Sequence, residues 1–449
     1  MNTKILEECF GEQIESNSIN RIWTDSRSLE AGDVFVAIKG DNFDGHAFLE
    51  QAQEKGAVAL IGTEAPPKSI RIPYIQVSDS VEAIRKLAAA YRATLKLTII
   101  AVAGSNGKTT TKEFIFHHLA QIHGKDKVFK SKKSENSILG IGLSLLQIRT
   151  EEVAVLEVGI DEPGWMTKHL QILKPDIGII TTIQEEHLER LKDIETVARE
   201  ELRLASHLKD AEKIFVANYD SEWIRLEALG KNTLSYSLKH RADIEGKFLQ
   251  PNTLEAYGLH WKNPLPGPMN AENLLGSLAV VAAIHPELKI EGYRHLHSKL
   301  EVFQGEPHRS LWYESTQDCF VYDDCYNANP SSMEAAIQTF LEIAEGFGKV
   351  AILGDMFELG TTSQQSHQRI LNLAMVSGFD EILLFGSNFR KCLSEMPSQP
   401  TRVRSYTDKA ELREAIKSTR KDFAAYFVKG SRGNRLEEVL DLFPRKKNK

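Results

Sequence analysis

A glycine-rich heptapeptide, Gly104-Ser-Asn-Gly-Lys-Thr-Thr110, constrains the fold of this chain more than any other feature. It follows the apolar run at residues 97–103 and precedes a segment with helical spacing through Phe116 and Leu119. Glycines allow backbone N–H groups to wrap around phosphate oxygens, and the start of a helix adds a favourable partial charge. The sequence therefore predicts a strand, a phosphate-binding turn and a helix, in an α/β fold that binds a nucleoside triphosphate.

The residues of this loop are expected to have separate roles. Lys108 is placed to reach the β- and γ-phosphates, and the Thr109 hydroxyl to bind Mg²⁺. The loop is shorter than the common GxxxxGKS/T pattern, because Val102 stands where that pattern has its first glycine. An ordinary turn is the alternative, but the strand and the helix lie where a phosphate loop requires them. The predicted ATP-binding residues of the loop are Gly104, Ser105, Asn106, Gly107, Lys108, Thr109 and Thr110.

Apolar strands alternate with amphipathic helices along most of the chain, which is typical of parallel sheets covered on both faces. A length of 449 residues suggests two to four domains. We predict an α/β protein with a small α/β domain at 1–95, a central doubly wound P-loop ATPase domain at 96–300 and a Rossmann-like domain at 301–449. The expected strands are 33–38, 56–62, 97–103, 153–159, 177–183, 213–218, 320–324, 350–355, 381–386 and 424–430, and the expected helices include 81–94, 271–283 and 410–417.

Composition and charge argue against several classes of function. The chain has 55 basic and 62 acidic residues and a formal net charge of −7, so it gains no general attraction to nucleic acid or anionic membranes. A nucleic-acid-dependent P-loop motor is therefore disfavoured. The four cysteines are scattered without a CxxC pair, which fits a reducing compartment. The sequence has neither the pattern of a signal peptide nor an apolar run of about 18 residues, and we expect a cytoplasmic monomer that does not insert into membranes.

Two residues at strand ends are candidate magnesium ligands. Glu157 lies in the strand predicted at 153–159, and His187 follows the strand predicted at 177–183. In a parallel sheet, ligand chemistry gathers at the carboxyl ends of the strands, and a carboxylate there is a natural Mg²⁺ ligand. Each residue taken alone could equally be a surface or capping residue. Their position in the same sheet as the phosphate loop favours the functional interpretation, so the predicted catalytic residues are Lys108, Glu157 and His187.

Three polar segments follow strands in the last third of the chain. They are Asp323-Asp-Cys-Tyr-Asn-Ala-Asn-Pro330, Gly354-Asp-Met-Phe-Glu-Leu-Gly360 and Lys429-Gly-Ser-Arg-Gly433. Each places charged residues and glycine at the edge where a second doubly wound sheet would bind a ligand. The first segment also has the composition of an ordinary turn, and the residues alone do not decide between the two interpretations.

Taken together, these segments resemble the Mur ligases of peptidoglycan synthesis, from about residue 20 to about residue 440. Residues 104–110 resemble the family's ATP loop, and residues 323–330 and 354–360 resemble two signatures of its C-terminal domain. The Tyr-Asn-Ala-Asn-Pro and Asp-Met-x-Glu-Leu-Gly sequences favour the members that add D-alanyl-D-alanine. Residues 24–27 and 40–46 resemble the N-terminal domain that holds a UDP-sugar substrate. The substrate-binding residues implied there are Thr24, Asp25, Ser26, Arg27, Asp44, Gly45 and His46.

The resemblance also implies roles for residues of the other two domains. Asn136 matches an asparagine near the metal and the substrate, and Asn270 matches a position that contacts adenine. Arg309 and Asp324 would lie near the nucleotide. The residues expected near an incoming dipeptide are Asn327 and Asn329.

One position departs from the family pattern. Mur ligases usually carry a lysine that becomes carbamylated, and the added negative charge helps to bind a second Mg²⁺. The alignment of residues 197–204 places Glu201 at this position. Because a glutamate already carries a carboxylate, we expect Glu201 to fill the role without CO₂. The predicted metal ligands are Thr109, Glu157, His187 and Glu201.

The resemblance implies an ATP-dependent amide ligase with ATP and Mg²⁺ as cofactors. The terminal carboxylate of UDP-N-acetylmuramoyl-tripeptide would attack the γ-phosphate of ATP, and the amine of D-alanyl-D-alanine would then displace phosphate from the acyl phosphate. Two alternatives stay open from the sequence. One is a sister ligase with another amino substrate, and the other is a catalytically weak nucleotide-binding scaffold, which only the Glu201 departure supports.

Overall fold

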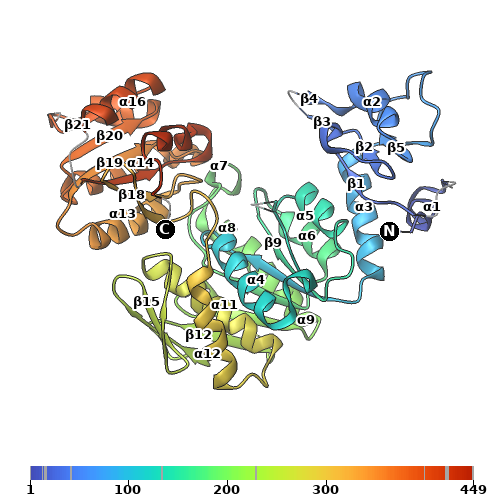
Figure 1. Ribbon diagram of the computed structural model, residues 1–449, viewed down its shortest axis with the longest axis horizontal. Coiled ribbons are helices and arrows are strands. Elements are labelled where there is room, and N and C mark those ends of the chain that lie inside the picture. Colours follow the sequence, from blue (N-terminus) through green and yellow to red (C-terminus); the bar gives the residue numbers. More distant parts are fainter. Residues whose placement is uncertain are drawn as a thin grey trace.

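The computed structural model describes residues 2–12, 14, 18–40, 43–132, 135–227, 230–398, 400–419 and 424–446. Asp41 and Asn42, in the segment 40–46 considered above, lie outside the described residues. The described residues form three α/β units that follow one another along the chain, each built around its own parallel or mostly parallel sheet (Figure 1).

The N-terminal unit has a four-stranded parallel sheet in the order β1-β2-β5-β6, and a small antiparallel hairpin, β3-β4. The strands are β1 (Ile22–Trp23), β2 (Val34–Val36), β3 (Lys39–Gly40), β4 (Phe43–Asp44), β5 (Ala59–Gly62) and β6 (Tyr74–Gln76). The helices are α1 (Lys4–Phe10), α2 (Leu49–Glu54) and α3 (Ser80–Thr94). Every residue of β2 and β5 is buried, as expected for strands covered on both faces.

The central unit has a seven-stranded sheet in the order β13-β12-β11-β10-β7-β9-β8, and every pairing in it is parallel. The strands are β7 (Thr98–Ala103), β8 (Val128–Lys130), β9 (Val153–Glu157), β10 (Ile177–Ile180), β11 (Ile214–Asn218), β12 (Thr233–Ser237) and β13 (Ile244–Glu245). The helices are α4 (Lys108–His123), α5 (Ile138–Leu145), α6 (Trp165–Leu173), α7 (Leu188–Leu191), α8 (Ile194–Glu201), α9 (Arg203–Asp210), α10 (Glu222–Arg225), α11 (Pro268–Ile284) and α12 (Ile290–Lys299). The strands expected at 97–103, 153–159, 177–183 and 213–218 all belong to this sheet.

The strands and helices expected from the sequence leave residues 219–270 without any element, and the structure differs there. The structure has a three-stranded antiparallel sheet there, with β14 (Lys247–Leu249), β15 (Thr253–Ala256) and β16 (Leu259–Lys262). A two-residue turn, Tyr257-Gly258, joins β15 to β16, and both of its residues have positive φ, 55° and 69°. Such turns usually carry asparagine or aspartate before glycine. Tyr257 stands in that position, so the sequence lacks the usual signal for a hairpin.

The C-terminal unit has a six-stranded sheet in the order β17-β18-β22-β19-β20-β21, and only β17 runs antiparallel to its neighbour. The strands are β17 (Leu311–Glu314), β18 (Phe320–Asp323), β19 (Gly348–Gly354), β20 (Glu381–Phe385), β21 (Val403–Tyr406) and β22 (Ala424–Lys429). The helices are α13 (Pro330–Ile343), α14 (Ser363–Val376), α15 (Ser387–Ser394) and α16 (Lys409–Ser418). Separate apolar clusters cover the two faces of this sheet.

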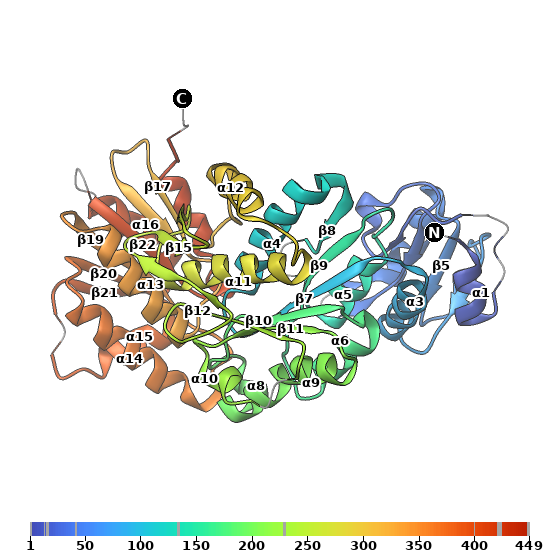
Figure 2. The same cartoon turned by 90° about the horizontal axis from the view of Figure 1, so that it is seen from below.

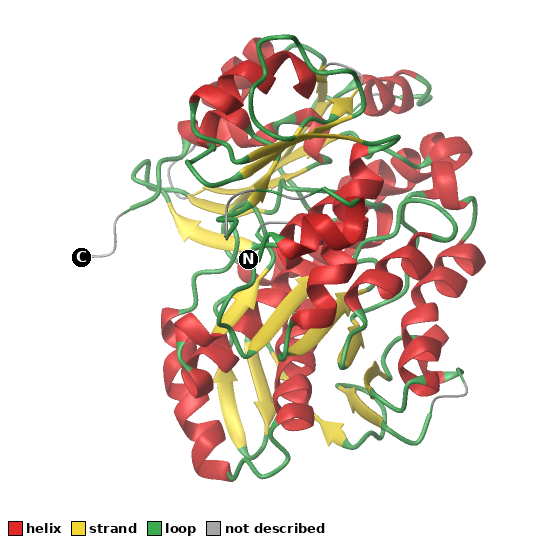
Figure 3. Ribbon diagram, turned by 90° about the vertical axis from the view of Figure 1, so that its right-hand side faces the viewer, coloured by secondary structure: helices red, strands yellow, loops and turns green. Residues whose placement is uncertain are grey.

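The central unit lies between the other two, as Figures 1 and 2 show from two directions, and Figure 3 shows the sheets with the helices around them. Helix α3 attaches the N-terminal unit, because Tyr91 Oη donates to the carbonyl of Ile148 at 2.6 Å and one apolar core includes residues of both units. The C-terminal unit touches α7, where Glu189 N donates to the carbonyl of Glu358 at 3.0 Å. The boundaries at residues 95 and 300 stay predictions.

None of the helices formed by these described residues is long and apolar enough to cross a lipid bilayer.

Candidate active site

The glycine-rich loop follows β7 and leads directly into α4, as the sequence predicts. Gly104 and Gly107 have φ values of 114° and 86°, which residues with a side chain rarely adopt. A Cβ atom on Gly104 would lie 2.4 Å from Thr181 Oγ1, and one on Gly107 would lie 2.3 Å from Asn273 Oδ1. Both glycines are therefore required by backbone angle and by space.

Residues that follow β10 hold the loop in place through backbone and side-chain hydrogen bonds. Ser105 Oγ donates to the carbonyl of Gln184 at 2.9 Å and accepts from Gln184 N at 2.9 Å. Thr181 Oγ1 donates to the carbonyl of Asn106 at 2.6 Å. These bonds fix the backbone of the loop in a conformation suited to binding phosphate.

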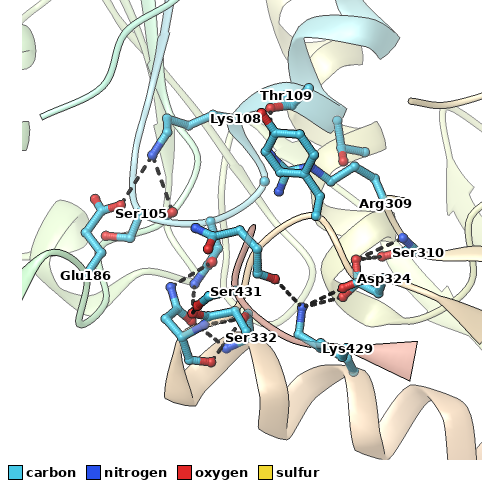
Figure 4. Close-up of a pocket in the computed structure, with 18 of the residues that line it drawn as sticks. Ser105, Lys108, Thr109, Glu186, Arg309, Ser310, Asp324, Ser332, Lys429 and Ser431 are labelled. Atoms are coloured by element: carbon cyan, nitrogen blue, oxygen red, sulfur yellow. Dashed lines mark hydrogen bonds and ion pairs between the residues drawn. The ribbon is translucent and has the colours of Figure 1, made fainter. Parts of the chain in front are cut away.

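Lys108 lies among buried acids at the back of the loop. Its Nζ donates to the carbonyl of Gly104 and lies 3.3 Å from Glu186 Oε2 (Figure 4). Burial by itself would lower the pKa of Lys108, but the negative charges of Glu186, Glu201 and Glu157 outweigh burial and raise it. Lys108 is therefore held as a cation next to the position that the loop provides for phosphate.

Glu201 lies at the C-terminal end of α8 with its side chain fully buried under the loop. Its Oε2 accepts from Gly104 N at 3.0 Å. Burial and the negative charge of Glu186 raise the pKa of the Glu201 carboxyl, while Lys108 lowers it. Within the part of the chain that the structure describes, Glu201 Oε1 and Glu186 Oε1 are buried without a hydrogen-bond partner, so this corner has an excess of acceptors.

Glu157 ends β9 and is brought together with two other predicted residues. Thr109 Oγ1 donates to Glu157 Oε2 at 2.9 Å, and Asn136 Nδ2 donates to Glu157 Oε1 at 3.0 Å. The buried ammonium group of Lys112 lies 3.8 Å from Glu157 Oε2 and donates to the carbonyl of Ser131 at 3.0 Å. Glu157 is only 1% exposed, so its carboxylate is held in one orientation beside the phosphate loop.

His187 follows β10 and precedes α7, with a positive φ of 48°. Its Nδ1 lies 2.5 Å from Glu358 Oε2 of the C-terminal unit, and its Nε2 lies 3.5 Å from Asp161 Oδ1. Burial would lower the pKa of His187, but the bond to Glu358 and the charges of Glu186, Glu358 and Asp161 raise it. In this arrangement His187 joins two units of the chain.

The residues around Thr109 and Glu157 suit a hard divalent cation. Mg²⁺ prefers oxygen ligands and is usually held by one or two carboxylates together with phosphate and water. Thr109 Oγ1 and Glu157 Oε2 lie 2.9 Å apart, and the buried carboxyl groups of Glu186 and Glu201 lie close enough to act on Lys108. Thr109 and Glu157 therefore fit Mg²⁺ as a pair, and the roles of His187 and Glu201 as ligands stay predictions.

The C-terminal unit supplies the opposite wall of the site. The Arg309 guanidinium lies 4.0 Å from the centre of the Tyr326 ring, and its Nη2 lies 3.4 Å from Thr109 Oγ1. Asp324 accepts from Lys429 Nζ at 2.5 Å and from Ser310 N at 2.9 Å. Figure 4 shows Arg309 next to Thr109 and places Asp324, Ser310 and Lys429 further from Lys108.

The two predicted dipeptide residues hold positions on this wall. Asn329 Nδ2 donates to Asn106 Oδ1 of the phosphate loop at 3.0 Å, and Asn329 also caps α13 by accepting from Ser332 N at 2.8 Å. The carbonyl of Asn327 accepts from Lys429 Nζ at 3.1 Å. Asn329 therefore has a structural role as a helix cap and joins the two units directly, so its expected substrate contact would be additional.

A cavity of about 340 Å³ lies between the central and C-terminal units. Most of the predicted site residues of these two units line it. They are Ser105, Asn106, Gly107, Lys108, Thr109, Thr110, Asn136, Glu157, His187, Asn270, Arg309, Asp324, Asn327 and Asn329. Gly104 and Glu201 lie at the loop but do not line the cavity.

Asn270 lies near the start of α11 and is buried at the edge of this cavity. Its Nδ2 donates to the carbonyl of Pro266 at 2.8 Å, and its Oδ1 accepts from Asn273 Nδ2 at 3.3 Å. The neighbouring Met269 also lines the cavity. The structure thus brings Asn270 to the phosphate loop, with its amide already bonded to the chain.

The predicted UDP-sugar residues form two local groups that do not line this cavity. Asp25 accepts from Arg27 Nη2 at 2.8 Å, and hydrogen bonds from the side chain and backbone of Arg27 lower the pKa of Asp25 to about 2. Asp44 Oδ1 lies 2.6 Å from His46 Nδ1, and bonds from the backbone and ring of His46 lower the pKa of Asp44 to about 2. Thr24, Ser26 and Gly45 lie beside these pairs in the chain.

Sequence reasoning missed two charged residues at the site. Glu186 immediately precedes His187 after β10, so its position at a strand end was a usable signal that was assigned only to the histidine. Lys429 ends β22 and is almost fully buried, with its ammonium group on Asp324. It belongs to the segment 429–433, which was expected at a ligand-binding edge, but Lys429 itself was not named as a site residue.

A preorganised phosphate loop, a buried lysine beside it and a second α/β sheet closing over both define a class of multi-domain, nucleotide-binding α/β enzymes. Three family models cover most of the chain: "Mur ligase family, catalytic domain" at residues 18–92, "Mur ligase middle domain" at 102–281 and "Mur ligase, glutamate ligase domain" at 308–432. The chain belongs to the Mur ligase family.

Full-length relatives and solved structures agree with this assignment. The UDP-N-acetylmuramoyl-tripeptide–D-alanyl-D-alanine ligase of Bacillus subtilis is 31% identical, over 95% of this chain and 94% of its own length. A crystal structure of MurF from Acinetobacter baumannii has a TM-score of 0.85 at 26% identity, over 98% of both chains. The MurF ligase of Thermotoga maritima, solved in complex with ADP, has a TM-score of 0.79 at 26% identity, over 94% of this chain and 97% of its own.

Proposed function

We propose that this chain adds D-alanyl-D-alanine to UDP-N-acetylmuramoyl-tripeptide in peptidoglycan synthesis, with conversion of ATP to ADP and phosphate. The observation that carries this proposal is the cavity between the two larger units. It joins the phosphate loop to the Tyr-Asn-Ala-Asn-Pro and Asp-Met-x-Glu-Leu-Gly segments. An ATP-derived activated acid and an amine could meet only in such a shared space.

In the first step, the phosphate loop and Lys108 would bind the phosphates of ATP. The backbone N–H groups at the start of α4 and the ammonium group of Lys108 would stabilise the negative charge of the phosphates. The acceptor carboxylate attacks the γ-phosphorus, a bond forms between its oxygen and phosphorus, and ADP leaves. Two anions approach each other in this step, so the fixed positive charge of Lys108 reduces their repulsion.

Mg²⁺ held by Thr109 and Glu157, with His187 and Glu201 as further candidate ligands, would supply Lewis-acid stabilisation of the phosphate charge when bound. The chain's own contribution is to fix the orientation of these groups. Asn136 and Lys112 hold the Glu157 carboxylate, and the carboxylate in turn orients the Thr109 hydroxyl.

The amine end of the reaction would be served by the C-terminal unit. The amine of the dipeptide attacks the acyl carbon, the bond from carbon to the phosphate oxygen breaks, and an amide forms. Arg309 and Lys429 line this side and can hold the leaving phosphate or the dipeptide carboxylate by charge-assisted hydrogen bonds. Closure of the C-terminal unit over the loop would exclude water, which otherwise hydrolyses the acyl phosphate.

Glu201 would supply the negative charge that relatives obtain by carbamylating a lysine. Its buried carboxyl group accepts from Gly104 N and lies near Lys108 and Glu186. Because burial and the charge of Glu186 raise its pKa to about 8, a bound cation would have to displace its proton. The test is whether activity depends on CO₂. We expect equal rates in CO₂-depleted and bicarbonate-supplemented buffer, and a rate that rises strongly with bicarbonate would contradict the proposal.

The experiment that tests the function measures phosphate release from ATP in the presence of Mg²⁺. UDP-N-acetylmuramoyl-tripeptide and D-alanyl-D-alanine are added singly and together, and the product is weighed by mass spectrometry. We expect release only with both, with a product heavier by the dipeptide. Release with a different amine would instead indicate a sister ligase, and tight ATP binding without release under any combination would indicate a scaffold.

The cytoplasmic location and the monomeric state stay proposals that rest on the sequence alone.

A further inference from the structure

A cluster of metal-ligating side chains lies beside the cavity without lining it. Asp323 ends β18, Cys325 follows two residues later, and His308 lies in the segment that enters β17. His308 Nδ1 lies 2.9 Å from Asp323 Oδ2, and Cys325 Sγ donates to Asp323 Oδ1 at 3.2 Å. The three ligand atoms all lie within 4.8 Å of one another.

The cluster is largely shielded from water. Cys325 and Asp323 are 1% and 4% exposed, whereas His308 is partly exposed and offers a path from solvent. Glu437, in the turn Leu436–Leu442, lies close enough for its charge to affect both His308 and Cys325. Its Oε1 pairs with Arg432 at 2.8 Å, and its Oε2 is buried and makes no hydrogen bond to any described residue.

We propose that His308, Asp323 and Cys325 form a binding site for a thiophilic divalent cation, with Zn²⁺ as the expected occupant. Zinc sites are tetrahedral, with sulfur at about 2.3 Å and nitrogen or oxygen at about 2.0–2.2 Å, so their ligand atoms lie roughly 3.3–3.7 Å apart. The two hydrogen-bonded pairs of the cluster, at 2.9 and 3.2 Å, need only small shifts to reach this spacing. A thiolate and an imidazole select zinc over Mg²⁺, which prefers oxygen ligands.

Binding exchanges protons for the cation and involves no oxidation. The Cys325 thiol loses its proton to solvent and ligates as a thiolate, His308 ligates through the lone pair of neutral Nδ1, and Asp323 ligates as a carboxylate. In the metal-free chain, burial and the charge of Asp323 raise the pKa of the Cys325 thiol. The thiol is therefore protonated until the cation displaces its proton.

The position of the cluster gives the cation a consequence for the neighbouring site. His308 and Ser310 both have positive φ, 65° and 52°, and they flank Arg309, which reaches Thr109 of the phosphate loop. Asp324 already holds Ser310 through its backbone N–H. A cation on His308 and Asp323 would fix the other side of this strained segment, and would thereby hold Arg309 in place.

The test is a titration of the full chain with Co²⁺, which replaces Zn²⁺ and reports thiolate ligation by near-ultraviolet charge-transfer absorption. The protein is reduced beforehand with a phosphine, and ADP and excess Mg²⁺ occupy the oxygen-ligand site. We expect the absorption to saturate at one Co²⁺ per chain and to disappear when Zn²⁺ is added. Absence of the absorption in the wild-type chain would overturn the proposal.

Matched variants assign the ligands. Cys325→Ser should abolish the absorption, while Cys392→Ser, which changes an equally buried thiol on α15, should leave it unchanged. His308→Gln, at a partly exposed position where folding is at little risk, should weaken Co²⁺ binding at least about tenfold. Zn²⁺ should raise the Tm of the wild-type chain and of Cys392→Ser, but much less that of His308→Gln. Equal absorption and equal Tm shifts in all four proteins would contradict the site.

Discussion

The nucleotide side and the acceptor side of this molecule are built in different ways. At the nucleotide side, hydrogen bonds join segments that are far apart in the chain, such as Asn106 and Asn329, which are 223 positions apart. In the N-terminal unit, the predicted UDP-sugar residues pair with neighbours two positions away, as Asp25 does with Arg27 and Asp44 with His46. The nucleotide side is therefore assembled from distant segments of two units, whereas the predicted acceptor residues make their contacts inside the N-terminal unit, where His46 Nε2 also accepts from Thr63 N at 2.9 Å.

This difference predicts that substitutions on the two sides will change different kinetic parameters. Changes at the nucleotide side should affect several steps at once, because each residue there supports others. Changes in the N-terminal unit should affect only the affinity for the UDP-linked acceptor. Four substitutions test this contrast, from the largest expected effect to the smallest.

Lys108→Met should lower kcat by about 10²–10³-fold or more, because it removes the fixed positive charge beside the phosphates. Phosphate release with both substrates present measures this effect. Lys231→Met, at an exposed position outside the cavity, is the matched control and should retain the wild-type rate. A Lys108→Met enzyme with near-normal kcat would remove the loop from the mechanism.

Arg309→Lys should raise the KM for ATP about tenfold, as expected for a lost hydrogen bond to a charged group. Lysine keeps the charge but lacks the planar group that stacks on Tyr326 at 4.0 Å. Initial rates at varied ATP and saturating acceptor give the KM. An unchanged KM would mean that Arg309 contributes only through its charge or not at all.

Arg27→Ala should raise the KM for UDP-N-acetylmuramoyl-tripeptide several-fold and leave the KM for ATP unchanged. The side chain is exposed and pairs with Asp25, so its loss should not affect folding. Both KM values are measured on the same preparation, and thermal unfolding checks stability. An equal rise in both KM values would contradict the claim that the N-terminal unit affects only the affinity for the acceptor.

Glu358→Gln should lower the pKa of His187, because it removes the carboxylate that pairs with Nδ1. In the folded chain this pKa is raised above its ordinary value of 6.5, and the pKa of Glu358 is lowered from 4.5, mainly by the bond to His187. The pair therefore stabilises the contact most between about pH 4.5 and 6.5. This contribution is lost as pH rises through the raised pKa of His187, and as pH falls through the lowered pKa of Glu358.

Imidazole NMR signals of the metal-free protein give the titration of His187 directly. The difference in unfolding free energy between wild type and Glu358→Gln should shrink above about pH 6.5. An identical His187 titration in the two proteins would mean that the contact between the two units does not depend on this ion pair.

The sequence predicted the parts of the fold that depend on local patterns. Apolar strands and the glycine loop were found because burial on both faces and phosphate binding each require particular residue types in order. The β15–β16 hairpin was missed because its turn uses Tyr257, which the usual turn preferences do not include. Glu186 was missed because only its neighbour His187 was considered at that strand end.

Contacts between units lay beyond the reach of sequence patterns. No local sequence pattern predicts the contact of Asn329 with Asn106 or the pair of Glu358 with His187. These contacts depend on how the two folded units pack against each other. The resemblance named many residues that line the cavity, but it did not say which of them would already be bonded. Asn329 and Asn270 are examples, since both carry structural hydrogen bonds besides their predicted roles.

The central claim is that the acceptor carboxylate is activated by forming a bond to the γ-phosphorus of ATP. The most direct measurement uses UDP-N-acetylmuramoyl-tripeptide labelled with ¹⁸O in its terminal carboxylate. After one turnover with ATP and D-alanyl-D-alanine, the account predicts one ¹⁸O atom in the released phosphate and one in the new amide. Phosphate without ¹⁸O, formed together with the ligated product, would contradict the account.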